Sequence, residues 1–167
     1  NFFQSNNNFG LNVSFIEERK PLGTAGSLSL INLNKIENII VINADVITGL
    51  QYEKILNYHK ENRFDITMAC MTHKYKVPFG SVIVKKNSFQ KIKEKPIFET
   101  LVNAGIYVIN KNLLKKMKKR NFMSMVDLIN KFVLPKKVGI FPMHEEWMDI
   151  GNKENLLLAR EKMFQEK

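Results

Sequence analysis

The sequence has little cysteine, glycine or proline, and it has no long hydrophobic run. Cys70 is its only cysteine, which excludes an internal disulfide and a cysteine-rich zinc site. Eight glycines and five prolines among 167 residues are too few for a fibrous or low-complexity chain. No apolar stretch approaches the roughly 20 residues that cross a bilayer, and no secretory signal is visible. These absences predict a soluble, cytoplasmic protein, in which Cys70 is a small buried core residue.

The residues that are present predict one globular domain spanning residues 1–167. Hydrophobic residues make up 44% of the chain and include 12 Phe and eight Met, which argues against disorder. The chain opens at Asn1 without Met, in a polar stretch (NFFQSNNN), so we expect it to be a piece of a longer protein.

The formal net charge is +10, from 26 Lys and Arg against 16 Asp and Glu. A basic chain could bind nucleic acid, because clustered cations neutralise phosphates. The only dense basic run here is Lys111–Arg120, which has leucines at helical spacing and indicates a helix with a solvated basic face. We therefore expect no specific nucleic-acid partner. A small polyanion such as a nucleotide suits the same positive field.

Short apolar runs alternate with longer segments of helical periodicity, each starting after a turn signal. The expected strands are Val13–Glu17, Ile39–Asn43, Ile66–Met71, Ser81–Val84, Phe89–Ile92, Val102–Ile109 and Val138–Pro142. The expected helices are Thr24–Leu33, Leu50–Asn62, Lys111–Lys119, Met123–Val133 and Asn152–Gln165, the last capped by Asn152. The run Ile39–Asn43 is continuously hydrophobic, which predicts a strand covered on both faces. The alternation predicts an α/β layered fold, whose ligands bind beyond the carboxyl ends of the strands.

Five segments place polar or small residues where such a fold would use them. Pro21–Gly26 has two glycines around Thr24, which lets backbone amides approach a ligand, or simply forms a tight turn. Asp45 follows the most hydrophobic strand and could hold Mg²⁺ or cap a turn. Asp149 precedes a helix, where an acid is also favoured by the helix dipole.

The other two segments have equally plain structural alternatives. Glu94 and Lys95, beside Pro96, could offer an acceptor to sugar hydroxyls and a cation to phosphate, or form an exposed charged turn. Asn103–Gly105 puts small polar residues inside an apolar strand, which indicates a close approach by another group.

Taken in order, these segments resemble the sugar-1-phosphate nucleotidylyltransferases, the nucleotide-sugar pyrophosphorylases. The likeness runs from about Phe9 to the C-terminus and rests on Leu22-Gly23-Thr24-Ala25-Gly26, Asn43-Ala44-Asp45, Phe79-Gly80, Glu94-Lys95-Pro96, Asn103-Ala104-Gly105-Ile106-Tyr107 and Trp147-Met148-Asp149-Ile150-Gly151. His144–Gly151 is most similar to the mannose-1-phosphate guanylyltransferase-like branch, which favours GTP. Some members of that branch carry a CBS-domain pair ahead of the transferase.

The resemblance implies a Rossmann-like, three-layer α/β domain of the GT-A-like kind, with a mixed, mostly parallel sheet flanked by helices. It implies a Mg²⁺-dependent reaction, in which a phosphate oxygen of a sugar 1-phosphate attacks the α-phosphorus of an NTP and pyrophosphate leaves. Asp45 and Asp149 match the metal carboxylates, and Lys95 matches the residue that neutralises the sugar phosphate. Sugar-side contacts match Gly80, Glu94 and Asn103, and the nucleotide loop matches Leu22, Gly23, Thr24 and Ala25.

The sequence departs from the family in two places. Ala44 stands where Gly is usual before the metal Asp. Nothing in Asn1–Gly10 resembles the family's opening Gly-rich loop with Arg and Lys, which holds the triphosphate. We therefore expect an N-terminally incomplete domain that is inactive alone, and a sheet edge open to self-association.

Three other functions stay open at this stage. A metal-dependent glycosyltransferase would be expected to carry Asp-x-Asp after the buried strand, where this chain has one acid, Asp45. A non-catalytic sensor of nucleotide or sugar phosphate would need neither metal carboxylate. A nucleic-acid binder would rest on net charge alone.

Overall fold

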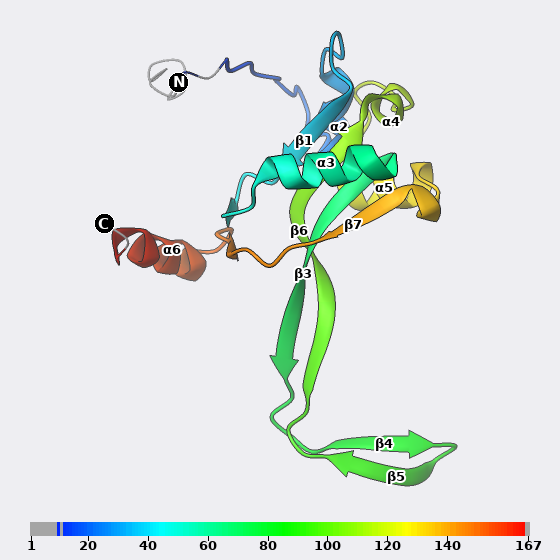
Figure 1. The fold of residues 1–167 in the computed structure, drawn as a ribbon, viewed down its shortest axis with the longest axis vertical. Helices are drawn as coiled ribbons and strands as arrows, with labels where there is room; N and C mark the ends of the chain where they lie inside the picture. The colour runs from blue at the N-terminus through cyan, green and yellow to red at the C-terminus, as the bar shows by residue number, and fades with distance from the viewer. Residues whose placement is uncertain (1–9, 11, 166–167) are drawn as a thin grey trace.

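A four-stranded mixed sheet with strand order β1-β6-β3-β7 forms the centre of the computed structural model, which describes residue 10 and residues 12–165 (Figure 1). Its strands are β1 (Asn38–Ile42), β3 (Ile66–Lys76), β6 (Ile97–Asn110) and β7 (Val138–Pro142). Strand β6 runs antiparallel to both of its neighbours, whereas β3 and β7 are parallel. Three strands therefore share one direction and β6 opposes them, which confirms an α/β fold with a mixed sheet.

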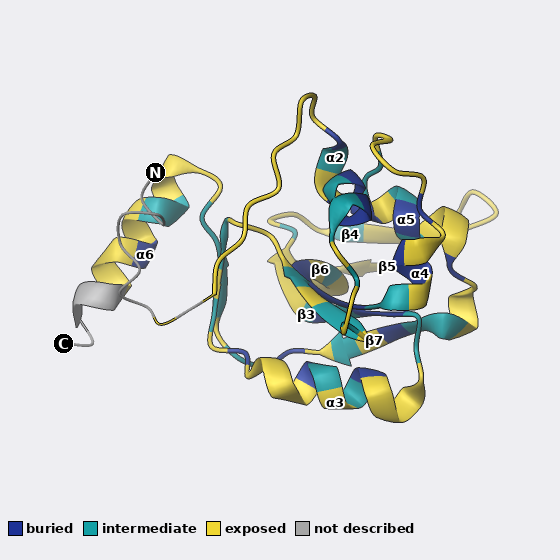
Figure 2. Ribbon diagram, turned by 90° about the horizontal axis from the view of Figure 1, so that it is seen from above, coloured by how far each residue is buried: buried dark blue, intermediate teal, exposed yellow. Residues whose placement is uncertain are grey.

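Helices cover the sheet on both faces (Figure 2). They are α2 (Gly23–Gly26), α4 (Lys111–Lys115) and α5 (Met125–Phe132) on one face and α3 (Tyr52–Asn62) on the other, with 3-10 turns at η1 (Ser27–Leu30) and η2 (Pro135–Lys137). Helix α6 (Lys153–Gln165) lies to one side of the sheet, next to the segment Trp147–Asp149. One core cluster joins α2, α4 and α5 to Tyr107 and Ile109 of β6. The other joins α3 to Ile106 and Val108 of the same strand. Alternate residues of β6 thus point into two cores, as a strand between two helical layers requires.

A buried histidine ties helix α3 to the sheet. His59 is 1% exposed, and its ring contacts Thr67 Oγ1 of β3 at 2.9 Å and Asn38 Oδ1 of β1 at 3.1 Å. Burial lowers the pKa of His59, because a charged imidazole loses its hydration there. The neutral His59 ring therefore connects helix α3 to strands β1 and β3 through its two hydrogen bonds.

Two small sheets extend the central one. Strands β2 (Val46–Thr48) and β8 (Trp147–Asp149) pair antiparallel, and sequence periodicity predicted neither of them. Strands β4 (Ser81–Lys85) and β5 (Ser88–Lys93) form a hairpin. This hairpin stands at the end of a long ribbon made by the outer halves of β3 and β6 (Figure 1). We call residues 72–101, the ribbon and its hairpin together, the arm.

Several expected elements differ from the observed ones. Val13–Glu17 is not a strand, because no described strand lies beside it to complete a ladder, and its apolar side chains are exposed. The helix expected at Thr24–Leu33 is only α2 followed by η1, where the Ser29 hydroxyl donates to the Gly26 carbonyl. The helix expected at Lys111–Lys119 ends at Lys115.

The sequence also predicted how far strand β1 and Cys70 are buried. Strand β1 is not covered on both faces, since it is an edge strand among the described residues and Ile40 and Ile42 are 36% and 40% exposed. Cys70 is buried within β3 as expected, and burial raises the pKa of its thiol. Among the described residues, no helix combines the length and the apolar character that crossing a membrane requires.

Gly139 of β7 offers a test of how tightly β7 packs against Phe64 and Thr67. A Cβ at this position would lie 2.4 Å from Phe64 Cδ2 and 2.8 Å from Thr67 Oγ1. Gly139→Ala should therefore lower the free energy of unfolding in urea by about 1–3 kcal/mol, the usual cost of overpacking. Gly49→Ala is the matched control, because no atom lies within 4 Å of its added methyl. Equal stability of the two variants would contradict this packing.

Candidate functional site

The two acids singled out from the sequence, Asp45 and Asp149, are brought together by the pairing of β2 with β8. Val46 and Asp149 are partners in that ladder, and the amide of Ile150 donates to the carbonyl of Asp45 at 2.8 Å. A Cβ on Gly151 would lie 2.9 Å from Asp149 Oδ1 and 3.1 Å from Asp45 Oδ2. The two carboxylates therefore converge on one glycine.

The start of helix α6 orients Asp149. Its Oδ1 accepts the amide of Gly151 at 2.8 Å, and its carbonyl accepts the side-chain amide of Asn155 at 2.7 Å. The Asn152 side chain accepts the amide of Asn155 at 2.8 Å, which confirms Asn152 as the cap of this helix. Both acids are partly exposed, so their oxygens stay accessible to a ligand.

The donor chemistry of this pair fits a hard divalent cation. Mg²⁺ prefers carboxylate oxygens and is usually held by one or two of them, with water and phosphate oxygens completing its shell. Within residue 10 and residues 12–165, no group of three or more His, Cys, Asp or Glu side chains could hold a metal. A site here therefore has two carboxylate ligands and leaves the other positions open.

A cleft of about 590 Å³ joins Asp45 to the glycine-containing loop. Its floor is the end of β1 with Asn43, Ala44 and Asp45, and one wall is made by Gly23, Thr24 and Ser27. Ile150 and Leu156 close the other side. The structure thus joins two segments that the sequence places 20 residues apart, as a ligand contacting both would require.

The loop is held in place by residues 121–125. The amides of Ala25 and Gly26 both donate to the carbonyl of Met123, at 2.9 and 3.2 Å, and Met123 donates back to Leu22 at 2.8 Å. These two amides are therefore not available to a phosphate. Leu22 and Ala25 are buried, whereas Thr24 is exposed, so Gly23 and Thr24 are the loop residues that face the cleft.

Gly105 of β6 makes room for Asn43, two residues before Asp45. Gly105 has φ of +72°, and a Cβ there would lie 2.8 Å from the side-chain amide of Asn43. The side chain of Asn103 holds this part of the strand, because its Oδ1 accepts the Gly105 amide at 3.0 Å while its amide donates to the Tyr107 hydroxyl. Asn103 and Gly105 therefore shape the edge of the cleft, as the small residues in this strand indicated.

The three remaining predicted residues do not lie at the cleft. Gly80, Glu94 and Lys95 sit together on the arm, where a Cβ on Gly80 would meet Glu94 Oε2 at 3.1 Å. Lys95 has φ of +44° and occupies the turn between β5 and β6. The arm points away from the body in Figure 1, so within one chain these residues are separated from Asp45 and Asp149.

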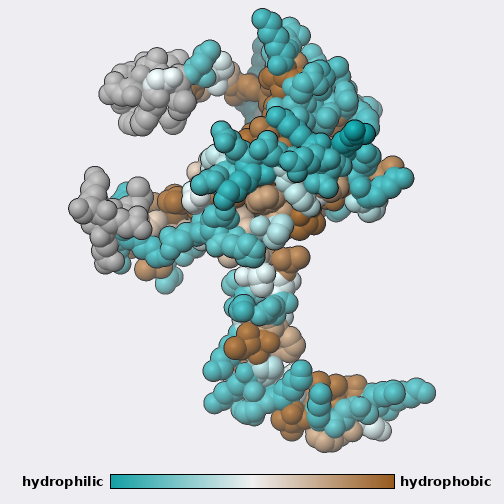
Figure 3. All heavy atoms as spheres, in the orientation of Figure 1, coloured by the Kyte–Doolittle hydropathy of each residue, from teal (hydrophilic) through white to brown (hydrophobic). Residues whose placement is uncertain are grey.

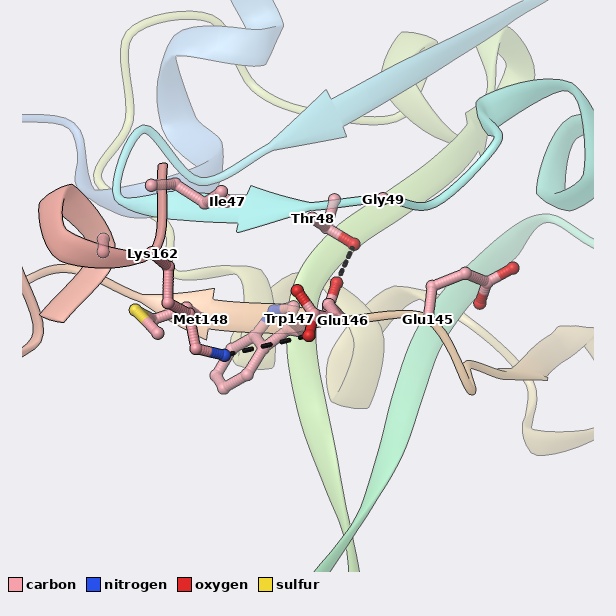
Figure 4. Close-up of a pocket in the computed structure, with 9 residues that line it drawn as sticks. Ile47, Thr48, Gly49, Glu145, Glu146, Trp147, Met148 and Lys162 are labelled. Atoms are coloured by element: carbon pink, nitrogen blue, oxygen red, sulfur yellow. Dashed lines mark hydrogen bonds and ion pairs between the residues drawn. The ribbon is translucent and has the colours of Figure 1, made fainter. Parts of the chain in front are cut away.

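A second pocket, of about 470 Å³, lies between the β2–β8 pair and helix α6 (Figure 4). Its polar rim holds Glu145, Glu146 and Lys162, and Lys162 Nζ lies 3.8 Å from Glu146 Oε1. The Glu145 carboxylate accepts hydrogen bonds from the backbone amides of Glu145 and His144, which lower the pKa of Glu145. Sequence motifs assigned no role to these rim residues: Glu145 and Glu146 fall in the segment His144–Gly151 that carries part of the resemblance, and no motif connects them with Lys162, 17 and 16 residues later.

Comparison with known proteins gives a consistent result. A family model described as nucleotidyl transferase matches residues 1–166. A candidate mannose-1-phosphate guanyltransferase of Sulfolobus acidocaldarius is 33% identical over 144 residues, covering 83% of this chain and 39% of the relative. A mannose-1-phosphate guanyltransferase of Yarrowia lipolytica is 29% identical over 157 residues, covering 89% of this chain and 43% of the relative.

The same similarity extends to solved structures. The crystal structure of HddC from Yersinia pseudotuberculosis matches with a TM-score of 0.71 and 25% identity, covering 96% of this chain and 71% of that one. Of the two curated relatives above, from Sulfolobus acidocaldarius and Yarrowia lipolytica, the chain spans less than half the length.

Thr24 gives a test of how the loop is fixed. Its hydroxyl oxygen accepts the amide of Met125 at 2.8 Å, at the first turn of α5. Thr24→Val keeps the shape but leaves that amide without its partner, so we expect a loss of about 1 kcal/mol in urea unfolding. Thr24→Ser, which retains the oxygen, should stay close to the parent. Equal losses in both variants would show that the bond contributes nothing.

Proposed function

Because this chain belongs to the nucleotidyl transferase family, we propose that it is part of a sugar-1-phosphate nucleotidyltransferase that forms a nucleotide sugar and releases pyrophosphate. The observation that carries this proposal is the convergence of Asp45 and Asp149 beside the cleft that also contains Gly23 and Thr24. A cleft with hard oxygen ligands at one end and a small-residue loop at the other suits a metal-bound nucleotide.

The reaction class fits these residues without a covalent enzyme intermediate. A phosphate oxygen of the sugar 1-phosphate bonds to the α-phosphorus as the bond to the leaving pyrophosphate breaks, which mainly requires positioning and charge neutralisation. Asp45 and Asp149 would hold Mg²⁺, which when bound neutralises phosphate charge. Mg²⁺ as the metal is part of the proposal, and it rests on the carboxylate pair.

Gly23 and Thr24 are the proposed contacts to the base and ribose, since both line the cleft. Leu22 and Ala25 would act through their backbone, because their side chains are buried. GTP is the proposed nucleotide and mannose 1-phosphate the proposed sugar substrate, and the names of the two curated relatives support this choice.

Lys95 is proposed to neutralise the sugar phosphate, with Glu94, Gly80 and Asn103 contacting the sugar. Asn103 supports this by its place beside Gly105 at the cleft edge, where it is exposed. A cytoplasmic location is proposed because NTPs are cytoplasmic substrates and a lone reduced cysteine suits that compartment. A CBS-domain pair in a longer parent chain stays a prediction.

Product binding tests the proposal directly. GDP-mannose should bind the 167-residue chain in the presence of Mg²⁺, and binding should weaken by at least about tenfold in Asp45→Asn and in Asp149→Asn if each holds the metal. Titration calorimetry with and without Mg²⁺ measures this. Glu61→Gln, an exposed acid on α3, is the matched control and should bind as the parent does.

Two results would contradict the proposal. Binding of GDP-mannose that is unaffected by both Asp variants would remove the metal role. If GDP-mannose, UDP-glucose and dTDP-glucose all fail to bind, the chain does not bind nucleotide sugars. If UDP-glucose or dTDP-glucose binds and GDP-mannose does not, the proposed base is no longer guanine.

Turnover is expected to be absent or very low in these 167 residues alone. Residues 1–10 contain no glycine-rich segment with Arg and Lys, so the sequence offers no such group to the leaving pyrophosphate. With Mg²⁺, GTP and mannose 1-phosphate, a coupled pyrophosphate assay should stay near its enzyme-free background. Robust pyrophosphate release from the isolated chain would overturn this expectation.

A further inference from the structure

The residues that line the cleft all belong to the body of the protein, the described residues outside the arm, which lies above the arm in Figure 3. Four of them have polar side chains: Thr24, Ser27, Asn43 and Asp45. Thr24 and Ser27 stand on the wall, where the Thr24 hydroxyl accepts the amide of Met125. On the cleft floor, the described residues thus offer a ligand one polar side chain besides the acid, that of Asn43.

The backbone of Asn43 is held in place from two sides. Its amide donates to the carbonyl of Gly105 on β6 at 2.9 Å, and its carbonyl accepts the amide of Val46 at 3.3 Å, which closes a turn over Ala44 and Asp45. These two backbone bonds are the hydrogen bonds of Asn43 to the other described residues. The side chain of Asn43 is exposed, so its amide group stays available to a ligand.

Gly105 orients the side chain of Asn43. A Cβ at Gly105 would lie 2.8 Å from Asn43 Nδ2, 3.0 Å from its Cγ and 3.2 Å from its Cβ, so the side chain lies over the space that the glycine leaves open. Because Nδ2 is the polar atom nearest to Gly105, Oδ1 is on the opposite side of Cγ and is turned toward the cleft that Asn43 lines. Asn43 thus presents a hydrogen-bond acceptor to the cleft.

The neighbours of Asn43 place this acceptor between the acids and the proposed sugar side of the site. Asp45 follows two residues later, and Gly105, which is bonded to Asn43, donates its amide to Asn103 Oδ1 at 3.0 Å. An amide oxygen requires a donor, and a sugar hydroxyl supplies one, whereas an ionised phosphate oxygen carries no proton to donate. In a sugar 1-phosphate whose phosphate is held by a metal on Asp45, the hydroxyl on C2 is the sugar hydroxyl nearest to that phosphate.

We propose that Asn43 Oδ1 accepts a hydrogen bond from the 2-hydroxyl of the sugar, which makes Asn43 a residue that determines sugar specificity. This role rests on the proposed function. Mannose and glucose differ only in the configuration at C2, so an acceptor fixed by the Asn43 backbone and by Gly105 favours one orientation of that hydroxyl over the other. Gly105 serves this contact indirectly, because a side chain there would displace the Asn43 amide.

The experiment measures the dissociation constants of three ligands by titration calorimetry with Mg²⁺ on the 167-residue chain. The ligands are GDP-mannose, its analogue without the sugar 2-hydroxyl, and its analogue without the ribose 2′-hydroxyl. In the parent chain, the sugar analogue should bind about three- to tenfold more weakly than GDP-mannose, the usual effect of losing one neutral hydrogen bond. In Asn43→Ala this difference should fall below about twofold, because the acceptor is gone.

Three further variants separate this contact from other effects. Asn43→Asp keeps an oxygen at the place of Oδ1 and should retain the difference between GDP-mannose and the sugar analogue. Asn43→Leu lacks the acceptor but fills the space over Gly105, so it repeats the test if urea unfolding shows that Asn43→Ala does not fold. Asn57→Ala, at an exposed asparagine of α3 on the other face of the sheet, is the matched control and should bind all three ligands as the parent does.

Two results would overturn this role of Asn43 and leave the proposed function standing. One is equal binding of GDP-mannose and the sugar analogue by the parent, and the other is a difference that persists in Asn43→Ala and Asn43→Leu. If these variants remove the effect of the ribose 2′-hydroxyl instead, Asn43 contacts the nucleotide and the proposal is likewise wrong. If none of the three ligands binds the parent chain, the proposed function fails together with this contact, so the two failures give different results.

Discussion

The antiparallel pairing of β2 with β8 is the contact on which the candidate site depends. The pairing of three residues in each strand brings Asp45 and Asp149 together. The hydrogen bond from the Ile150 amide to the Asp45 carbonyl sets the register of the two acids. Residues of the same two strands line the second pocket, and Asp45 and Ile150, which flank the pairing, line the cleft beside β1. Without it, Asp149 would belong to a separate C-terminal segment, and neither acid would have a partner.

Strand β6 connects this contact to the rest of the molecule. It pairs with β1 and β3, contributes alternate side chains to both cores, and has Gly105 where Asn43 needs space. Its outer half continues as the arm. One strand thus contributes to both cores, to the surroundings of the cleft and to the arm, so a single backbone sets the position of each relative to the others.

Hydrophobic runs in the sequence were enough to predict β1, β3, β6 and β7 and the α/β class. Asp45 was singled out because it follows the run of β1, and Asp149 because it precedes a helix. Two kinds of feature had no such signal. Strands β2 and β8 are three residues long, too short for periodicity, and Val13–Glu17 shows the pattern of a strand but has no described neighbour to pair with. The support of the loop by Met123 and Met125 joins segments about 100 residues apart, and local pattern carries no information on such contacts.

The pairing of β2 with β8 joins segments that are far apart in the chain, and this has a consequence for how the protein is made. Thr48 and Glu146, bonded at one end of this pairing, are 98 residues apart in the chain. During synthesis Asp149 therefore emerges from the ribosome 104 residues after Asp45, and closing so long a loop comes late in folding. Until Asp149 has emerged, the chain holds a single acid at this place, so the carboxylate pair of the candidate site forms only after β8 has been made.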